Sequence, residues 1–151
     1  MIEDRLSELG IILPEAAAPV ASYVPAVESG GMLYISGQLP FIDGEIMTGK
    51  VGDSRSEEEA HAAAKACGIM LLAQMKKALG SLERVERIVK LGVFVASTPD
   101  FTGQPKVANG ASDLMAAVFG DAGQHARSAV AVPVLPLDAT VEIDAVVAVK
   151  A

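Results

Sequence analysis

Tryptophan is absent from this sequence, cysteine occurs once, and only two tyrosines and four phenylalanines are present. A single cysteine cannot form an internal disulfide, and such cysteine usage is typical of a reducing compartment. The first ten residues lack the basic region and apolar core of a secretory signal, and no apolar run approaches the ~20 residues of a membrane span. We therefore expect a cytoplasmic protein with no membrane segment.

Basic residues are also few, because 12 Lys and Arg stand against 19 Asp and Glu and give a formal net charge of −7. Nucleic-acid-binding proteins usually carry a clustered basic surface with aromatic side chains between the charges. The basic residues here are scattered, so the composition argues against a nucleic-acid partner. Apolar residues nevertheless make up 51% of the chain, and such a surplus is often buried between subunits.

The 151 residues suffice for one domain with its own core. Patterning predicts helices at residues 2–9, 56–79 and about 102–119, and strands at 23–27, 32–36, 88–96, 127–134 and 139–149. Apart from the first short helix, the order is β-β-α-β-α-β-β. This order predicts an α+β domain of the ferredoxin-like kind, with a mixed sheet backed by two helices on one face.

Several common kinds of site are excluded by residue type and spacing. His61, Cys67 and His125 are too few and too far apart to suggest a metal site. The glycines fit neither a dinucleotide-binding fingerprint nor a phosphate-binding loop, and Ser36 is not in a nucleophile elbow. We therefore expect no metal and no cofactor. His125 could act as a general base, but the sequence identifies no partner for it.

Arg127 is the residue most clearly suited to chemistry. It is the only charged residue from Ala126 to Leu137, and a guanidinium in such a strand must reach solvent or meet an anion. Its planar fork suits a carboxylate ligand. The alternative is a structural ion pair with Glu142 or Asp144, and the sequence alone favours neither.

The geometry of the last two strands bears on this choice. If they form a hairpin around Pro136, Glu142 lies opposite residue 131 and shares a face with Ala129 and Arg127. The small residues at 129 and 131 then leave space between the guanidinium and the carboxylate. That space could hold a small anionic substrate and one water, or the two charges could form a spaced ion pair.

Four segments together resemble the RidA/YjgF family of enamine and imine deaminases, also called L-PSP endoribonucleases. These segments are Leu33–Pro40 (LYISGQLP), Gly80–Val85 (GSLERV), His125–Pro136 (HARSAVAVPVLP) and Val141–Ala145 (VEIDA). With Tyr23, the resemblance covers residues 21–151, and residues 1–20 are an N-terminal extension. It implies a chorismate-mutase-like fold and a homotrimer with clefts between subunits.

The resemblance also implies roles for particular residues. Arg127 corresponds to the arginine that binds the substrate carboxylate, and Glu142 to the glutamate that positions water. Four further residues correspond to ones that line the cleft: Tyr23, Ser36, Gly37 and Asn109. Ala129 is also expected to contribute to the substrate-binding cleft, at a position where a cysteine is usual in the family. With Ser22, where a proline is usual, this departure indicates a resemblance to a divergent branch.

Three functions of different classes follow. The first is a hydrolytic deaminase that converts 2-aminoacrylate-type imino acids to 2-oxo acids and ammonia, by orientation and electrostatic stabilisation alone. The second is a non-catalytic trimer that binds a small carboxylate-bearing metabolite or a partner protein in the same cleft. The third is an endoribonuclease, against which the acidic composition argues.

Overall fold

The computed structural model describes residues 1–19 and 21–151. Within these ranges the helices are α1 (Ile2–Glu8), α2 (Glu57–Leu79) and α3 (Gln104–Phe119), with short 3-10 turns η1 (Leu82–Arg84), η2 (Gly120–Gly123) and η3 (Pro136–Asp138). The strands are β1 (Ala26–Ser29), β2 (Met32–Gln38), β3 (Phe41–Ile42), β4 (Glu45–Ile46), β5 (Val85–Ala96), β6 (Ala126–Val132) and β7 (Val141–Val149). The α+β class predicted from the sequence is confirmed.

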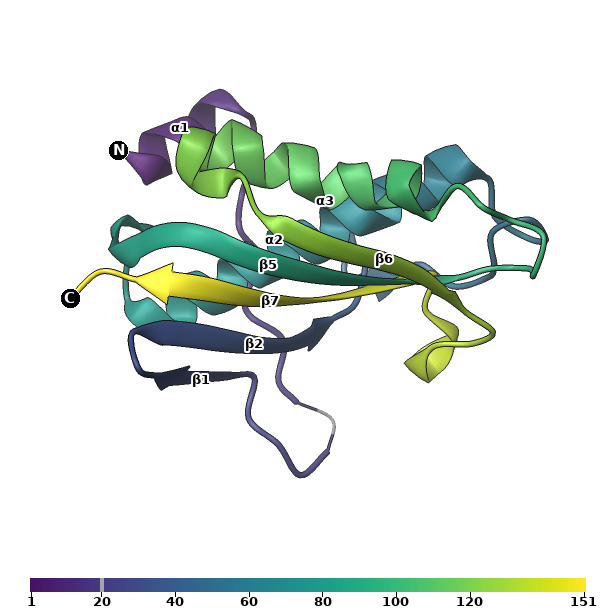
Figure 1. Ribbon diagram of the computed structural model, residues 1–151, viewed down its shortest axis with the longest axis horizontal. Coiled ribbons are helices and arrows are strands. Elements are labelled where there is room, and N and C mark those ends of the chain that lie inside the picture. The colour runs from purple at the N-terminus through teal and green to yellow at the C-terminus, as the bar shows by residue number, and fades with distance from the viewer. Residues whose placement is uncertain (20) are drawn as a thin grey trace.

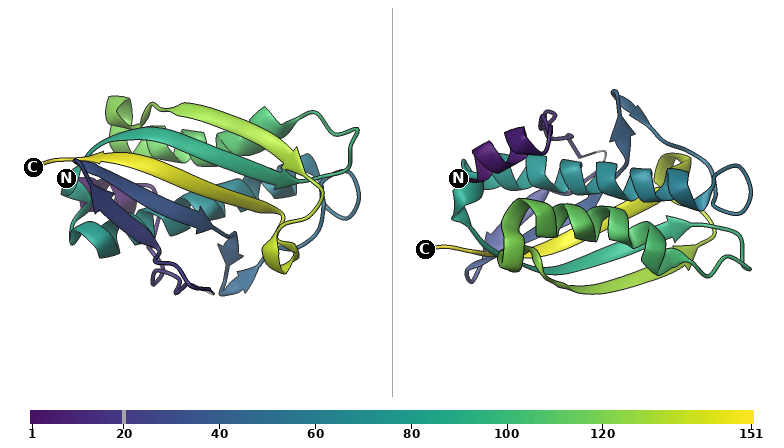
Figure 2. Two further views of the ribbon diagram at one scale, coloured as in Figure 1. Left: turned by 60° about the horizontal axis from the view of Figure 1, so that its bottom comes forward. Right: turned by 90° about the horizontal axis from the view of Figure 1, so that it is seen from above.

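The main sheet has five strands in the order β1-β2-β7-β5-β6. Neighbouring strands pair antiparallel except β5 and β6, which run parallel. Parallel pairing needs a long crossover connection, and α3 supplies it. Helices α2 and α3 lie side by side on one face of the sheet, whereas none of the described helices covers the other face (Figures 1 and 2).

Helix α2 begins and ends where its sequence predicts. The Ser56 hydroxyl accepts a hydrogen bond from the Glu59 amide at 3.1 Å, and the Glu59 carboxylate accepts one from the Ser56 amide at 3.0 Å. These two bonds satisfy amides that have no partner within the helix. The helix ends at Gly80, whose φ of 81° is left-handed and favours glycine. Cys67, in the middle of α2, is fully buried in the core.

Helix α3 packs closely against α2. Pro105 stands in its first turn, where a missing amide hydrogen costs nothing. Gly110 faces α2, and an added Cβ there would collide with the carbonyl oxygen of His61. A glycine that weakens helix propensity is therefore required by the approach of the two helices.

Strands β6 and β7 do not form the predicted hairpin, because β5 lies between them. Arg127 on β6 stands beside Leu91 on β5, and Glu142 on β7 stands beside Phe94. Successive strand residues point to opposite faces, so Leu91 and Phe94, three positions apart, do as well. Arg127 and Ala129 face the helices and Glu142 faces away from them. The predicted shared face is wrong.

Burial explains why β7 takes the centre of the sheet. Five alternate residues of this strand are buried, from Val141 to Val149, and the residues between them are partly covered or exposed. A strand that needs this much cover is better placed between β2 and β5 than at an edge. The parallel crossover then leaves β6 as the edge strand on the far side of β5.

Smaller differences concern the first half of the chain. The first strand begins at Ala26 rather than Tyr23, and a short hairpin, β3–β4, occupies a region with no predicted strand. Helix α1 forms as expected and is fastened to α3 by the Arg5 side chain, which donates to the Ala117 carbonyl at 2.8 Å. No helix in the described ranges combines the length and apolar character that a membrane crossing requires.

Candidate functional site

Arg127 lies at the start of β6 on the face that carries the helices. Its Nη1 donates hydrogen bonds to Asn109 Oδ1 at 2.8 Å and to Ser112 Oγ at 3.1 Å. Asn109 and Ser112 are three residues apart on α3, so both side chains lie on one side of that helix. Two neutral acceptors thus fix the guanidinium without neutralising its charge, which leaves it able to bind an anion.

The same contacts test the predicted alternative of an ion pair between Arg127 and a carboxylate of its own chain. Arg127 takes part in none of the ion pairs found among the described residues. Glu142 and Asp144 extend from the other face of the sheet. The alternative of an ion pair with either carboxylate in the same chain is therefore wrong.

His125 has a partner that sequence reasoning missed. Its Nδ1 lies 2.6 Å from the Gly123 carbonyl oxygen, and its Nε2 lies 2.9 Å from Ser112 Oγ. A carbonyl can only accept, so Nδ1 carries a proton, and Nε2 is hydrogen-bonded to the Ser112 hydroxyl. Arg127, Ser112 and His125 therefore form one hydrogen-bonded chain, beside a shallow pocket that these three residues help to line.

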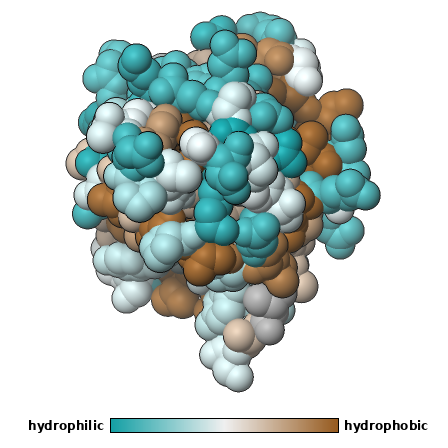
Figure 3. Space-filling model, turned by 90° about the vertical axis from the view of Figure 1, so that its right-hand side faces the viewer, coloured by the Kyte–Doolittle hydropathy of each residue, from teal (hydrophilic) through white to brown (hydrophobic). Residues whose placement is uncertain are grey.

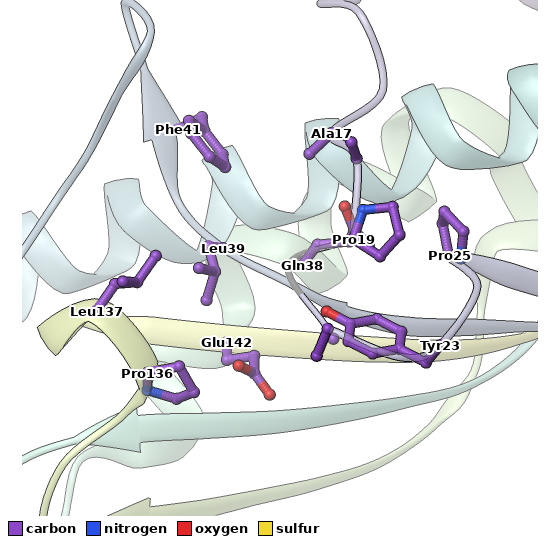
Figure 4. Close-up of a pocket in the computed structure, with 13 residues that line it drawn as sticks. Ala17, Pro19, Tyr23, Pro25, Gln38, Leu39, Phe41, Pro136, Leu137 and Glu142 are labelled. Atoms are coloured by element: carbon purple, nitrogen blue, oxygen red, sulfur yellow. The ribbon is translucent and has the colours of Figure 1, made fainter.

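Glu142 lies in a separate cavity of about 310 Å³ at the opposite side of the sheet. Figure 4 shows its carboxylate with the Tyr23 ring on one side and Pro136 on the other. The rest of the lining is mostly apolar and comes from Ala17, Ala18, Pro19, Ala21, Pro25, Gly37, Gln38, Leu39, Phe41 and Leu137. Figure 3 views this end of the molecule, where apolar side chains gather above the protruding loop that precedes β1.

Gly37 and Ser36 shape the space around Glu142. A Cβ added to Gly37 would lie 2.5 Å from Glu142 Oε2 and 2.7 Å from Cδ, so the carboxylate occupies the room that a side chain would take. The Ser36 hydroxyl donates to the Val24 carbonyl at 3.0 Å and holds the segment next to Tyr23 against β2. Ser36 therefore supports the cavity wall through a backbone contact.

The environment of Glu142 favours its protonated form. Burial raises the pKa of this carboxyl group, and the negative charge of Asp144, two residues along the strand, raises it further. A carboxylate whose pKa moves toward neutrality can both accept a proton from water and return it to a leaving amine.

The predicted site residues thus divide into two clusters. Arg127 and Asn109 come together with Ser112 on the helix-bearing face, and Ala129 follows Arg127 on that face, packed against the core. Tyr23, Gly37 and Glu142 line the cavity, which is supported by Ser36.

A group of residues from outside the predicted site closes the cavity on one side. Ala17, Ala18 and Pro19 line it, and Gln74 Nε2 donates to the Ala17 carbonyl oxygen at 2.9 Å. Gln74 stands among apolar residues at a core position of α2, and such a polar residue is the one sequence signal that could have indicated this contact. Within the described part of the chain, no three His, Cys, Asp or Glu side chains converge on a point that could hold a metal ion.

Comparison with known proteins identifies the class of this fold and site. The sequence model of the YjgF/chorismate mutase-like endoribonuclease family matches residues 3–147. The chain therefore belongs to the YjgF/RidA family.

Individual relatives agree with this assignment. Protein TCP17 of Trypanosoma cruzi is 56% identical over 95% of this chain and 91% of its own length. The crystal structure of Atu1372, a protein of unknown function from Agrobacterium tumefaciens, superimposes with a TM-score of 0.92 at 50% identity, over 99% of this chain and 92% of that one. A 2-iminobutanoate/2-iminopropanoate deaminase of Dermatophagoides farinae is 30% identical over 93% of this chain and 95% of its own length.

Proposed function

We propose that this protein is a hydrolytic deaminase of 2-imino acids, and that it acts as a homotrimer whose sites are each completed by two subunits. The observation that carries the proposal is the division of charge. Among the described residues Arg127 has no anionic partner, and it lies on one face of the sheet, whereas the half-buried carboxylate of Glu142 lies on the other. Each cluster supplies what the other lacks, so a second copy of the chain would complete the site.

The face of the sheet without helices is suited to pack against another subunit. Val27, Tyr34 and Val130 lie on this face and are about half exposed, at 49%, 49% and 48%. Exposed apolar side chains on such a face are typical of interfaces between subunits. An assembly with closed rotational symmetry would use the same contact repeatedly and generate identical sites.

In the proposed reaction, Arg127 binds the carboxylate of the imino acid and sets the position of its imine carbon. Glu142 accepts a proton from a water molecule as the water oxygen bonds to the carbon of the protonated imine, whose π electrons pass to nitrogen, which gives a neutral carbinolamine. The protonated Glu142 then returns the proton to the nitrogen. The carbon–nitrogen bond breaks and ammonia leaves, while the carbinolamine hydroxyl gives its proton to the carboxylate of Glu142 as the carbonyl of the 2-oxo acid forms, and Glu142 releases this proton to solvent. The relative named as an imino acid deaminase supports this chemistry.

The test generates an imino acid in situ and follows its trapping by semicarbazide. An L-amino-acid oxidase with catalase produces the imine, and added protein should lower the yield of semicarbazone while 2-oxo acid forms faster. Light scattering at micromolar concentration should return three times the 15.5 kDa mass of the chain. A monomer, or a trapping rate that the protein leaves unchanged, contradicts the proposal. A trimer that binds 2-oxo acids without accelerating hydrolysis would instead indicate the non-catalytic binding protein.

A further inference from the structure

The cavity around Glu142 has a wall that does not come from the sheet. Residues 17–19 and Ala21 form it, after the chain has left α1 and passed over the core with Ile11 and Leu13 packed against it. Figure 4 shows Ala17 and Pro19 across the cavity from Pro136 and Leu137. The N-terminal segment therefore reaches the same space as the carboxylate of Glu142.

A buried amide network fixes this wall. Gln74 on α2 is 2% exposed and Gln38 on β2 is 6% exposed. Gln74 Nε2 donates to the Ala17 carbonyl at 2.9 Å and to Gln38 Oε1 at 3.3 Å, and Gln38 Nε2 donates to the Ser36 carbonyl at 3.0 Å. A buried amide without partners would be costly. The pair of glutamines thus ties the N-terminal segment to the strand that carries Gly37.

The cavity is larger than the methyl side chain of the smallest imino acid needs, and its lining is mostly apolar. Its volume of about 310 Å³ is roughly twice the ~150 Å³ of an engineered apolar cavity that takes up benzene. Among the described lining residues, Glu142 and Tyr23 are the titratable ones, and most of the others are alanine, proline, leucine or phenylalanine. Such a lining binds an apolar group and leaves one carboxylate to meet a polar centre.

We propose that Ala17, Ala18 and Pro19 form one wall of an apolar subsite that takes a branched or aromatic side chain of the 2-imino acid, and that Gln74 positions this wall. The subsite deepens the proposed deaminase function and rests on it for the identity of the reacting group. Gln74 touches no substrate and acts through Ala17, so it is a positioning residue.

The subsite predicts a substrate preference that can be measured directly. The imine derived from leucine should have a kcat/KM at least about tenfold above that of the imine derived from alanine, because additional buried carbons contribute about tenfold or more. Ala17→Leu fills the subsite and should remove this preference by acting on the leucine-derived substrate alone. Ala16→Leu is the matched control, since Ala16 is also partly buried but does not line the cavity, and it should keep the preference.

Gln74→Met keeps the length and bulk of the side chain and removes its donors. We expect the preference to fall severalfold while trimer mass stays unchanged. Equal kcat/KM values for the two imines in the wild-type protein, or equal effects of Ala17→Leu and Ala16→Leu, would overturn the subsite.

A binding measurement separates failure of the subsite from failure of the deaminase proposal. Calorimetric titration with 4-methyl-2-oxopentanoate and with pyruvate needs no turnover. If neither imine is hydrolysed but the branched acid binds about tenfold more tightly, and Ala17→Leu abolishes that difference, the subsite stands and the reaction does not. If both imines are hydrolysed and the two acids bind equally, the reaction stands and the subsite falls.

Discussion

Arg127 and Glu142 extend from opposite faces of one sheet, with strand β5 between the two strands that carry them. Within a single chain, the sheet therefore separates the two groups. The neighbours of each residue agree with this division. Arg127 is held by neutral groups of α3, and Glu142 lies in an apolar cavity.

Subunit mixing tests the division of the site. Arg127→Ala and Glu142→Gln chains should each be inactive alone, because every site then lacks one group. Co-expressed in equal amounts, they should recover about a quarter of the wild-type activity. Each site takes Arg127 from one subunit and Glu142 from its neighbour, and each of these is intact in about half of the subunits. Activity that stays at the background of either single variant would show that both groups act within one chain.

Substitution of Arg127 tests whether the guanidinium serves a ligand rather than the fold. Arg127→Ala should lower kcat/KM by roughly 100-fold or more, while melting temperature and trimer mass stay close to the wild-type values. Arg127→Lys keeps the charge but loses the planar fork, so it should recover little activity. If Arg127→Ala melts far below the wild type and Arg127→Lys is active, Arg127 stabilises the fold and does not bind the substrate.

Ser112→Ala should raise KM about tenfold with little change in kcat, because Ser112 orients a group that binds the substrate carboxylate throughout the reaction. Ser7→Ala on α1 is the matched control and should leave both constants unchanged.

The hydrogen-bonded chain also predicts how His125 behaves in combination. His125→Ala acts on Arg127 through Ser112. The Ser112→Ala/His125→Ala double variant should therefore have a KM no higher than that of Ser112→Ala alone. Strictly additive losses in the double-mutant cycle would mean that His125 contacts the substrate itself.

The environment of Glu142 predicts a pH dependence of both rate and stability. Water activation needs the ionised carboxylate, so kcat should fall as pH drops through the raised pKa. Asp144→Asn removes the neighbouring negative charge and should shift this acidic limb to lower pH. An unshifted limb would exclude Asp144 as a contributor.

For stability the sign is opposite to that of an ion-paired carboxylate. The folded protein holds the Glu142 proton more tightly than the unfolded chain, so this group stabilises the fold least above its raised pKa. Glu142→Gln should therefore gain unfolding free energy relative to the wild type as pH rises from about the ordinary value of 4.5 through the raised pKa. Urea melts across that range check it, with Glu45→Gln as an exposed control.

The sequence predicts where the helices and strands of this fold lie better than it predicts which strands pair. The capping box at Ser56 and the strict alternation from Val141 onward are local signals, and both elements form as expected. The alternation of apolar and polar residues predicts which side chains of a strand are buried. It does not predict which other strand pairs with it. The pairing of β7 with β5 instead of β6 is decided by competition between distant segments, which a local pattern does not record.

The site shows the same limit. Arg127 could be singled out because it is the lone charge in an apolar strand, and Glu142 through the family resemblance. Ser112 carries no sequence signal of its own, because a serine on a helix face has many possible roles. The contribution of residues 17–19 depends on a path across the core that only the folded chain reveals.

Under the proposed function, the placement of the two clusters on opposite faces makes the catalytic rate depend on how much of the protein is assembled, and therefore on its concentration. A subunit released by dilution would keep its helices, its sheet and both of its functional groups, yet hold no complete site. Loss of turnover would then precede any loss of structure, and the specific activity of the protein would report how many subunits are assembled. A cell could regulate such an enzyme through the amount of chain that it makes, without a dedicated inhibitor.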